Sequence, residues 1–328
     1  MRIITAILLI GFILTVSPGF SQTCCSGGVP ISTNLGLPPS YQGTAQFTLT
    51  YDANILRTLK EGTTLIEDRA RERITSSLIL SAGYSITDRI GVEALIPFVR
   101  QERNITQPGG FNDFESTQGI GDMLILFKYR VTSLNSQKHV LSMGLGPKMP
   151  TGSSSELNSR GLILNADLQP GSGAWDIIYW GNYIYQLDSR PTMSLYSVVT
   201  YRQTGTNTDY LNGSSTYKIG ENLRILAGVS DQFRVGSVMF SPSLGVRYRK
   251  AQADEFNSEL LPSTGGDWVY LIPGAGISIT PNLTFETNVE LPLYANPTGT
   301  QLSPTYRVNI GLHYVLPKKN KGIENLVK

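Results

Sequence analysis

Cysteine is scarce in this 328-residue sequence, which has only two, adjacent to each other at Cys24 and Cys25. Neighbouring cysteines cannot cross-link distant parts of a fold, so stability must come from backbone hydrogen bonds and packing. The pair could close a strained ring, bind a soft metal ion such as copper(I), or cross-link to another chain. A segment in which neither cysteine has a specific role fits the sequence equally well.

Charge of one sign is also lacking, because 27 basic and 25 acidic residues leave a formal net charge of +2. A nucleic-acid-binding protein usually shows a clustered basic excess, so we expect no nucleic-acid partner. Only His139 and His313 are available as histidine bases. The sequence contains neither a G-x-S-x-G nucleophile elbow nor a His/Asp/Glu cluster with metal-ligand spacing. We therefore expect no enzyme activity and no cofactor.

Long hydrophobic runs are confined to the start of the chain. The mean hydropathy is −0.07, too polar for a bundle of membrane helices, and no later stretch approaches the roughly 20 apolar residues that such a helix needs. Residues 3–16 are almost wholly apolar and follow the positive start Met1-Arg2. This run has about the length of a secretion signal. We predict a signal peptide over residues 1–22, with an uncleaved anchor as the alternative.

Alternation with a period of two residues recurs through the rest of the chain. In residues 306–314 the apolar residues take the even positions, and polar residues or glycine take the odd ones. In residues 284–291, Phe285, Val289 and Leu291 face one way, and acidic or amide side chains face the other. This pattern is typical of strands with one apolar face.

About twelve such segments follow one another, each long enough to cross a membrane at a tilt. The sequence therefore predicts an all-β fold, a transmembrane antiparallel up-and-down β-barrel of about twelve strands behind a signal peptide. The predicted strands are 45–54, 72–86, 90–102, 119–131, 138–149, 174–187, 191–203, 216–229, 237–249, 267–279, 282–294 and 303–315.

The connections between these segments alternate between short and long, as expected for periplasmic turns and external loops. An even strand number then places both termini on the periplasmic side. A soluble β-sandwich is the alternative, but its strands are shorter and its loops need not alternate. The short turns are 87–89, 133–137, 187–190, 230–236 and 280–282, and the longer loops are 55–71, 103–118, 150–173, 204–215, 250–266 and 295–302.

Aromatic residues cluster near the segment ends, where a ring with a polar edge suits the membrane–water boundary. They are Tyr51, Tyr84, Phe98, Tyr129, Trp175, Tyr201, Tyr248, Trp268, Tyr294 and Tyr314. No second domain is evident. We expect an irregular leader at 23–44 that lies in the periplasm or enters the lumen, a barrel at 45–316, and a disordered tail at 317–328.

Three short motifs resemble a known family. Residues 119–122 read G-I-G-D, residues 146–152 read G-P-K-M-P-T-G, and residues 168–176 read L-Q-P-G-S-G-A-W-D. In this order and spacing they resemble strand markers of an outer-membrane barrel family named for the meta-pathway of phenol degradation. The resemblance implies a transporter of small, often hydrophobic compounds. The chain departs from a common barrel ending, because its last strand stops near Tyr314 and a charged tail follows.

If the apolar residues face lipid, their alternates face the lumen. Both signs of charge occur there, and buried charges must be paired or hydrated. The set describes either a polar channel lining or a salt-bridged interior that holds the barrel open or plugs it. For Asp122 we favour a structural role, paired with Lys128, with Arg130 or with a neighbouring strand. The predicted lumen residues are Glu93, Asp122, Lys128, Arg130, Asp176, Arg224, Arg247, Arg249, Glu286, Glu290, Arg307 and His313.

The sequence thus predicts an outer-membrane channel or transporter for small solutes, hydrophobic ones included. The expected partners are the lipid bilayer of the outer membrane, a small-molecule solute and the barrel-assembly machinery. Two alternatives remain open. One is a structural or surface-interaction barrel that uses its external loops, above all residues 151–169. The other is periplasmic metal handling through Cys24 and Cys25.

Overall fold

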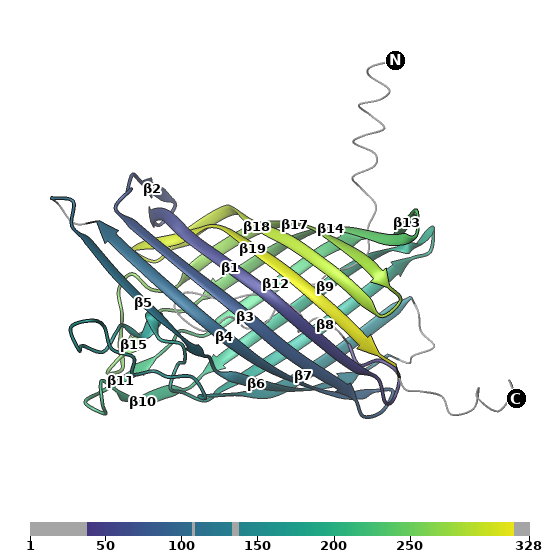
Figure 1. Ribbon diagram of the computed structural model, residues 1–328, viewed down its shortest axis with the longest axis horizontal. Helices are drawn as coiled ribbons and strands as arrows, with labels where there is room; N and C mark the ends of the chain where they lie inside the picture. Colours follow the sequence, from purple (N-terminus) through teal and green to yellow (C-terminus); the bar gives the residue numbers. More distant parts are fainter. Residues whose placement is uncertain (1–37, 107–108, 133–137, 318–328) are drawn as a thin grey trace, which may run out of the picture.

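The computed structural model describes residues 38–106, 109–132 and 138–317, which form a closed antiparallel barrel (Figure 1). Each wall strand pairs with its neighbours, and β1 closes the ring by pairing with β19. Closure leaves no open edge, as lipid requires. The twelve wall strands are β1 (Ala45–Glu61), β3 (Arg71–Ser85), β4 (Ile90–Thr106), β6 (Met123–Arg130), β7 (His139–Met149), β8 (Asp176–Leu187), β9 (Arg190–Thr204), β12 (Asn222–Ser230), β14 (Val238–Ala251), β17 (Gly266–Thr280), β18 (Leu283–Pro297) and β19 (Thr300–Leu316).

The outer wall is apolar and exposed. Along β3, Leu78 and Leu80 are 46% and 53% exposed, whereas Ile79 between them is 1% exposed. The same alternation runs around the ring and leaves many Leu, Ile, Val, Phe and Tyr side chains on the outside. Such a continuous apolar belt is unfavourable in water but matches the lipid-facing surface of a membrane barrel. The predicted barrel is thereby confirmed.

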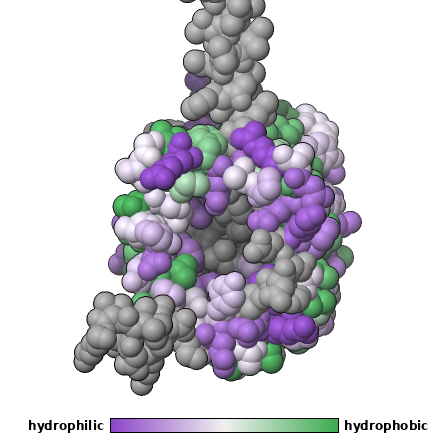
Figure 2. All heavy atoms as spheres, turned by 90° about the vertical axis from the view of Figure 1, so that its right-hand side faces the viewer, coloured by the Kyte–Doolittle hydropathy of each residue, from purple (hydrophilic) through white to green (hydrophobic). Residues whose placement is uncertain are grey.

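The two ends of the barrel differ. The short connections lie at the end where β1 begins and β19 ends, at the right of Figure 1. Figure 2 views this end directly and shows hydrophilic side chains gathered around the rim of a central hollow. The other end carries the long loops. We call these the turn end and the loop end.

Several small elements decorate the wall. β5 (Asn112–Ile120) pairs with β4 and continues the line of β6 beyond a break at Gly121-Asp122. β2 (Thr64–Ile66) and β13 (Phe233–Val235) extend hairpins. At the loop end, β10 (Thr206–Tyr210), β11 (Ser215–Lys218), β15 (Glu255–Phe256) and β16 (Glu259–Leu260) form a second sheet, and η1 (Ala166–Leu168) is a single 3₁₀ turn. Among the described residues, no helix is long and apolar enough to span a bilayer.

Each predicted segment overlaps one wall strand, but several predicted loops were wrong in part. β1, β4, β18 and β19 continue into the predicted loops 55–71, 103–118 and 295–302, so β18 and β19 are joined by residues 298–299 alone. Outside the membrane both faces of a strand meet water, so the ladder continues without apolar alternation. The predicted strand 216–229 is instead two pieces, because β11 belongs to the loop sheet and β12 starts at Asn222.

Residues 38–44 lie at the turn end. Gly43 N donates to Ser85 O at 2.8 Å, and Pro39 is buried beside Gly91. Pro38 and Pro39 line a small cavity together with the inward side chains Glu93 and Lys128. The rest of the predicted leader lies outside the described residues, as do the predicted signal peptide, Cys24-Cys25 and the tail from residue 318.

Candidate functional site

Charged side chains form layers inside the barrel. Of the twelve predicted lumen residues, Glu286 and His313 are half-buried and all the others are buried. Near the turn end Lys128 Nζ lies 2.6 Å from Glu93 Oε2, and its ammonium sits 4.7 Å from the Trp180 ring centre. His313 Nδ1 is within 3.0 Å of Thr48 Oγ1. Here the interior is held by paired groups from neighbouring strands.

A second charged layer joins β1, β14, β18 and β19. Arg307 donates from Nε and Nη2 to the two oxygens of Asp52, at 2.8 and 2.6 Å. Arg247 Nη1 donates to Glu290 Oε1 at 2.6 Å. Two-point binding of a carboxylate fixes the guanidinium and makes a strong hydrogen-bonded pair. Sequence reasoning missed Asp52, although its position between Tyr51 and Ala53 on an alternating strand was a usable signal.

The interior also contains a zone of apolar side chains, which the sequence analysis did not predict. Leu124 and Leu126 of β6 point inward and are buried, as are Leu95 of β4, Trp180 of β8 and Val198 of β9. Residues 123–127 are apolar on both faces, so a two-residue period gave no sign of which residues face the lumen. The interior therefore combines buried charged pairs with a zone of buried apolar side chains.

Glycines in β7 make room for these apolar side chains. A Cβ on Gly144 would lie 3.1 Å from Trp180 Cε3, and one on Gly146 would lie 1.8 Å from Ile125 O. Only a residue without a side chain allows so close an approach of backbone and ring. The first glycine of the G-P-K-M-P-T-G motif is thus explained by packing between β6 and β7.

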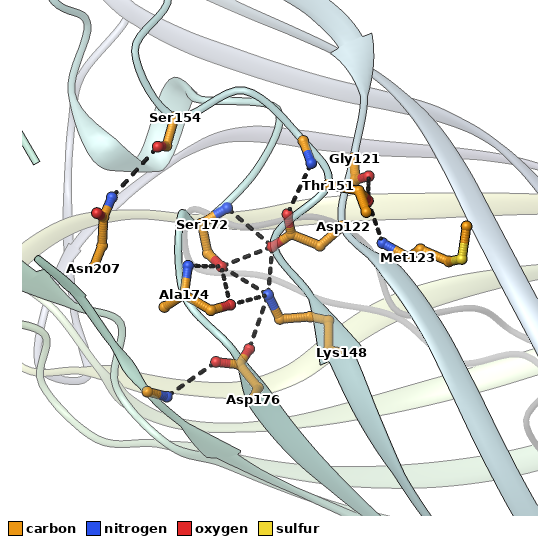
Figure 3. A network of polar contacts seen from close by, with 12 residues as sticks. Gly121, Asp122, Met123, Lys148, Thr151, Ser154, Ser172, Ala174, Asp176 and Asn207 are labelled. Carbon is orange, nitrogen blue, oxygen red and sulfur yellow. Dashed lines mark hydrogen bonds and ion pairs between the residues drawn. The ribbon is translucent and has the colours of Figure 1, made fainter. Parts of the chain in front are cut away.

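The three sequence motifs meet in one polar network at the loop end (Figure 3). Lys148 Nζ forms ion pairs with Asp122 Oδ2 and, at 3.1 Å, with Asp176 Oδ2. Ser172 Oγ accepts from Lys148 Nζ at 2.7 Å, and Arg202 Nε donates to Asp176 Oδ2 at 2.7 Å. Each of the three motifs contributes one charged residue, so the family signature is a single spatial unit.

Backbone groups complete the network. Asp122 accepts from Ser172 N at 3.0 Å and Gly152 N at 3.2 Å, while Asp176 Oδ1 accepts from Gly205 N at 3.1 Å. Buried charges are tolerated when their remaining hydrogen-bonding capacity is satisfied in this way. Of the three partners expected for Asp122, the structure shows the neighbouring strand, because Lys148 of β7 pairs with it while Lys128 pairs with Glu93.

The network anchors the base of residues 150–175, and this loop folds into the barrel mouth. Arg73 Nη1 donates to Asp167 Oδ2 at 2.5 Å, and Gln101 Nε2 donates to Gln169 O at 2.8 Å. Thr117 Oγ1 donates to the carbonyl of Leu168, a residue that is 0% exposed. The longest loop is therefore tied to the inner wall at Asp167, Leu168 and Gln169.

A cavity of about 550 Å³ opens at the loop end between this loop, the loop sheet and the inner wall. Its aromatic lining includes Tyr210, Tyr217, Phe256 and Trp268, and its charged lining includes Arg73, Arg103, Arg249, Asp167 and Asp254. Trp268 was expected at the membrane boundary, but it is 2% exposed and lies inside, with the Arg249 guanidinium 4.4 Å from its ring centre. The boundary position predicted for Trp268 was therefore wrong.

Asp254 is held by two donors in the loop region. Tyr217 Oη donates to its Oδ2 at 2.6 Å and Gly220 N to its Oδ1 at 2.8 Å. Burial raises the pKa of Asp254 above its usual value, and burial next to this carboxyl raises the pKa of Tyr217. Both groups are therefore biased toward their neutral forms within the cavity wall.

Most of the chain matches a known protein family. Residues 44–294 match the profile of the family described as "Putative MetA-pathway of phenol degradation". The chain belongs to this family. The match spans most of the barrel and includes all three motifs. No curated protein matches the sequence.

Solved structures show the same architecture. An outer-membrane channel from Pseudomonas putida F1 is similar with a TM-score of 0.65 at 14% identity, covering 92% of this chain and all of that one. Lower similarity is found with the transport unit of the autotransporter AIDA-I from Escherichia coli (TM-score 0.46, 12% identity, 87% and 92% covered) and a FadL homologue from Pseudomonas aeruginosa (0.42, 11%, 92% and 98%). The first similarity shows the fold. Together with the apolar outer belt, it places this family member in an outer membrane.

Proposed function

We propose that this barrel is a non-catalytic channel that passes small solutes, hydrophobic ones included, across the outer membrane. The observation that carries the proposal is the mixed interior, in which buried apolar side chains from β4, β6, β8 and β9 lie alongside layers of buried charged pairs. A solute with apolar and polar parts finds a partner for each along such a wall. The cavity at the loop end supplies a place of entry. The similar Pseudomonas putida protein is itself described as an outer-membrane channel.

Transport is tested on the purified full chain. Ion conductance in planar bilayers and uptake of small aromatic and polar solutes into liposomes are expected above the level of empty membranes. A folded barrel that gives neither conductance nor uptake would contradict the proposal. We also propose that the barrel-assembly machinery inserts the chain, because the outer face of β19 carries the apolar residues Tyr306, Ile310, Leu312 and Tyr314 close to its end.

The inward loop is expected to limit flow through the channel. Gln101→Ala removes the side-chain donor to Gln169 O in residues 150–175. It also removes the acceptor for Nη2 of Arg73, the residue that holds Asp167 of the same loop. Losing a buried hydrogen bond costs about 1–3 kcal/mol, and each 1.4 kcal/mol raises the population of a released loop about tenfold. Single-channel conductance in planar bilayers should therefore increase and fluctuate more than in the unmodified protein.

Gln118→Ala is the matched control for this experiment. Gln118 lies on the adjacent strand β5 at the same level of the wall, but it points outward and is exposed. Its removal should leave conductance unchanged. If both variants conduct alike, the loop does not form the constriction.

A further inference from the structure

Two arginines face each other at the inner wall of the loop-end cavity. Arg73 of β3 and Arg103 of β4 are direct cross-strand partners, and both line the cavity. Like charges in this arrangement repel each other unless anions lie between or beside them. Asp167 neutralises Arg73 from one side and Glu115 neutralises Arg103 from the other. The two guanidinium groups remain adjacent at the cavity wall.

Each of these arginines also has an unused donor. The Nε atoms of Arg73 and Arg103 are buried and make no hydrogen bond within the described residues. Because these Nε atoms are buried, a ligand in the cavity meets the outer edges of the two guanidinium groups, and two such groups side by side indicate a position where an anionic oxygen would be stabilised. Carboxylate oxygens are well suited, since they accept several charge-assisted hydrogen bonds at once.

The aromatic residues of the cavity suit an apolar part of the ligand. The Tyr210 ring is tilted against Tyr217 at 5.1 Å and meets Phe256 edge-on at 6.3 Å, each distance being between ring centres. These three rings come from β10, β11 and β15 of the loop sheet, and Trp268 comes from β17. Aromatic walls of this kind favour a flat, apolar ligand body. A volume of about 550 Å³ accommodates a single ring with its substituents.

The carboxylates that line the cavity are already occupied. Asp167 is bound by Arg73, and Asp254 accepts from Tyr217 Oη and Gly220 N. The cavity lining contains three arginines and two aspartates, and Asp254 is biased toward its neutral form, so the lining disfavours a cationic ligand and favours an anionic one.

We infer that the loop-end cavity binds single-ring aromatic carboxylates, with the carboxylate at the Arg73–Arg103 pair and the ring among Tyr210, Tyr217 and Phe256. This inference deepens the proposed channel function and rests on it, because it names the class of solute captured at the mouth. It assigns a ligand to residues that lie outside the three sequence motifs.

Binding is measured by isothermal titration calorimetry on the full chain folded in detergent micelles. The probes are benzoate, benzyl alcohol, which has the ring without the charge, and acetate, which has the charge without the ring. Benzoate is expected to bind at least about tenfold more tightly than either. Equal affinity for benzoate and acetate, or for benzoate and benzyl alcohol, would overturn the inference.

Arg103→Gln is expected to weaken benzoate binding about tenfold or more, the size of one lost charge-assisted hydrogen bond, and to leave benzyl alcohol binding unchanged. Arg103→Lys keeps the positive charge beside Glu115 and serves if the glutamine variant fails to fold. It should also weaken benzoate binding, because an ammonium group cannot bind a carboxylate through two parallel donors as a guanidinium can. The matched control is Arg100→Gln on the same strand, since Arg100 is exposed on the outer wall and pairs with Glu102.

Unchanged benzoate affinity in both Arg103 variants would refute the site. Conductance is recorded on the same preparations in planar bilayers. A barrel that conducts but shows no preference for benzoate overturns this inference alone, whereas a barrel that neither conducts nor takes up solutes contradicts the proposed function.

Discussion

Replacing Lys148 by methionine is expected to destabilise the barrel by about 3–5 kcal/mol, because it removes the cation between two buried carboxylates. Asp122 and Asp176 are 0% and 1% exposed at their side chains. Asp176 keeps Arg202, but Asp122 would keep only neutral donors. The midpoint of urea unfolding in detergent micelles, followed by tryptophan fluorescence, measures the loss.

The matched control for this change is Lys138→Met. Lys138 also pairs with a carboxylate, but the side chains of Lys138 and Asp188 are 64% and 62% exposed, so the midpoint of unfolding should hardly change. Adding Asp122→Asn to Lys148→Met should recover part of the stability, since a neutral amide needs no cation. Equal losses at Lys138 and Lys148, or no recovery in the double variant, would show that the network does not stabilise the fold.

Gly146→Ala is the second change with a large expected effect. The new Cβ would lie 1.8 Å from Ile125 O and 2.8 Å from Leu126 Cα, and both of these atoms belong to the backbone of β6. Backbone cannot move aside as a flexible side chain can, so β6 and β7 would have to separate. We expect a cost at or above the about 1–3 kcal/mol typical of overpacked interiors. Refolding yield in detergent, read from the shifted migration of folded barrel on unheated gels, should fall sharply.

Gly181→Ala tests the same substitution where there is space. Gly181 lies on the next strand, β8, and a Cβ there meets nothing within 4 Å. Stability should change by less than about 1 kcal/mol, with removal of glycine flexibility favouring the folded state. If both variants refold equally well, the close contact at Gly146 is not a requirement of the fold.

The wall of the barrel could be predicted from the sequence because the membrane imposes a simple rule on it. Lipid on one side makes residues such as Leu78 and Leu80 apolar, and the alternation reveals the strands. Beyond the membrane both faces of a strand meet water, so the alternation stops there. Residues such as Arg103 and Glu115 lie beyond the point where alternation is readable, so the end of β4 and most of β5 were predicted as a loop.

The interior was harder to predict because its contacts depend on register between strands. The position of Asp122 on its strand is visible in the sequence, but its partner Lys148 is not, since 26 residues separate them. The inward Leu126 is hidden among apolar neighbours. The inward course of residues 150–175 has no local signal, because it depends on Arg73, Gln101 and Thr117 from distant strands.

The network around Lys148 also divides the loop end into parts with different freedom to change. Its residues fix where the longest loop leaves and returns to the wall, and any substitution there disturbs several buried charges at once. Tyr210 and Tyr217 lie on the β10–β11 hairpin and Phe256 lies on β15, and the three rings take no part in this network. Natural or engineered variants could therefore exchange these three rings, and with them the preferred solute, while the frame of the barrel mouth stays intact.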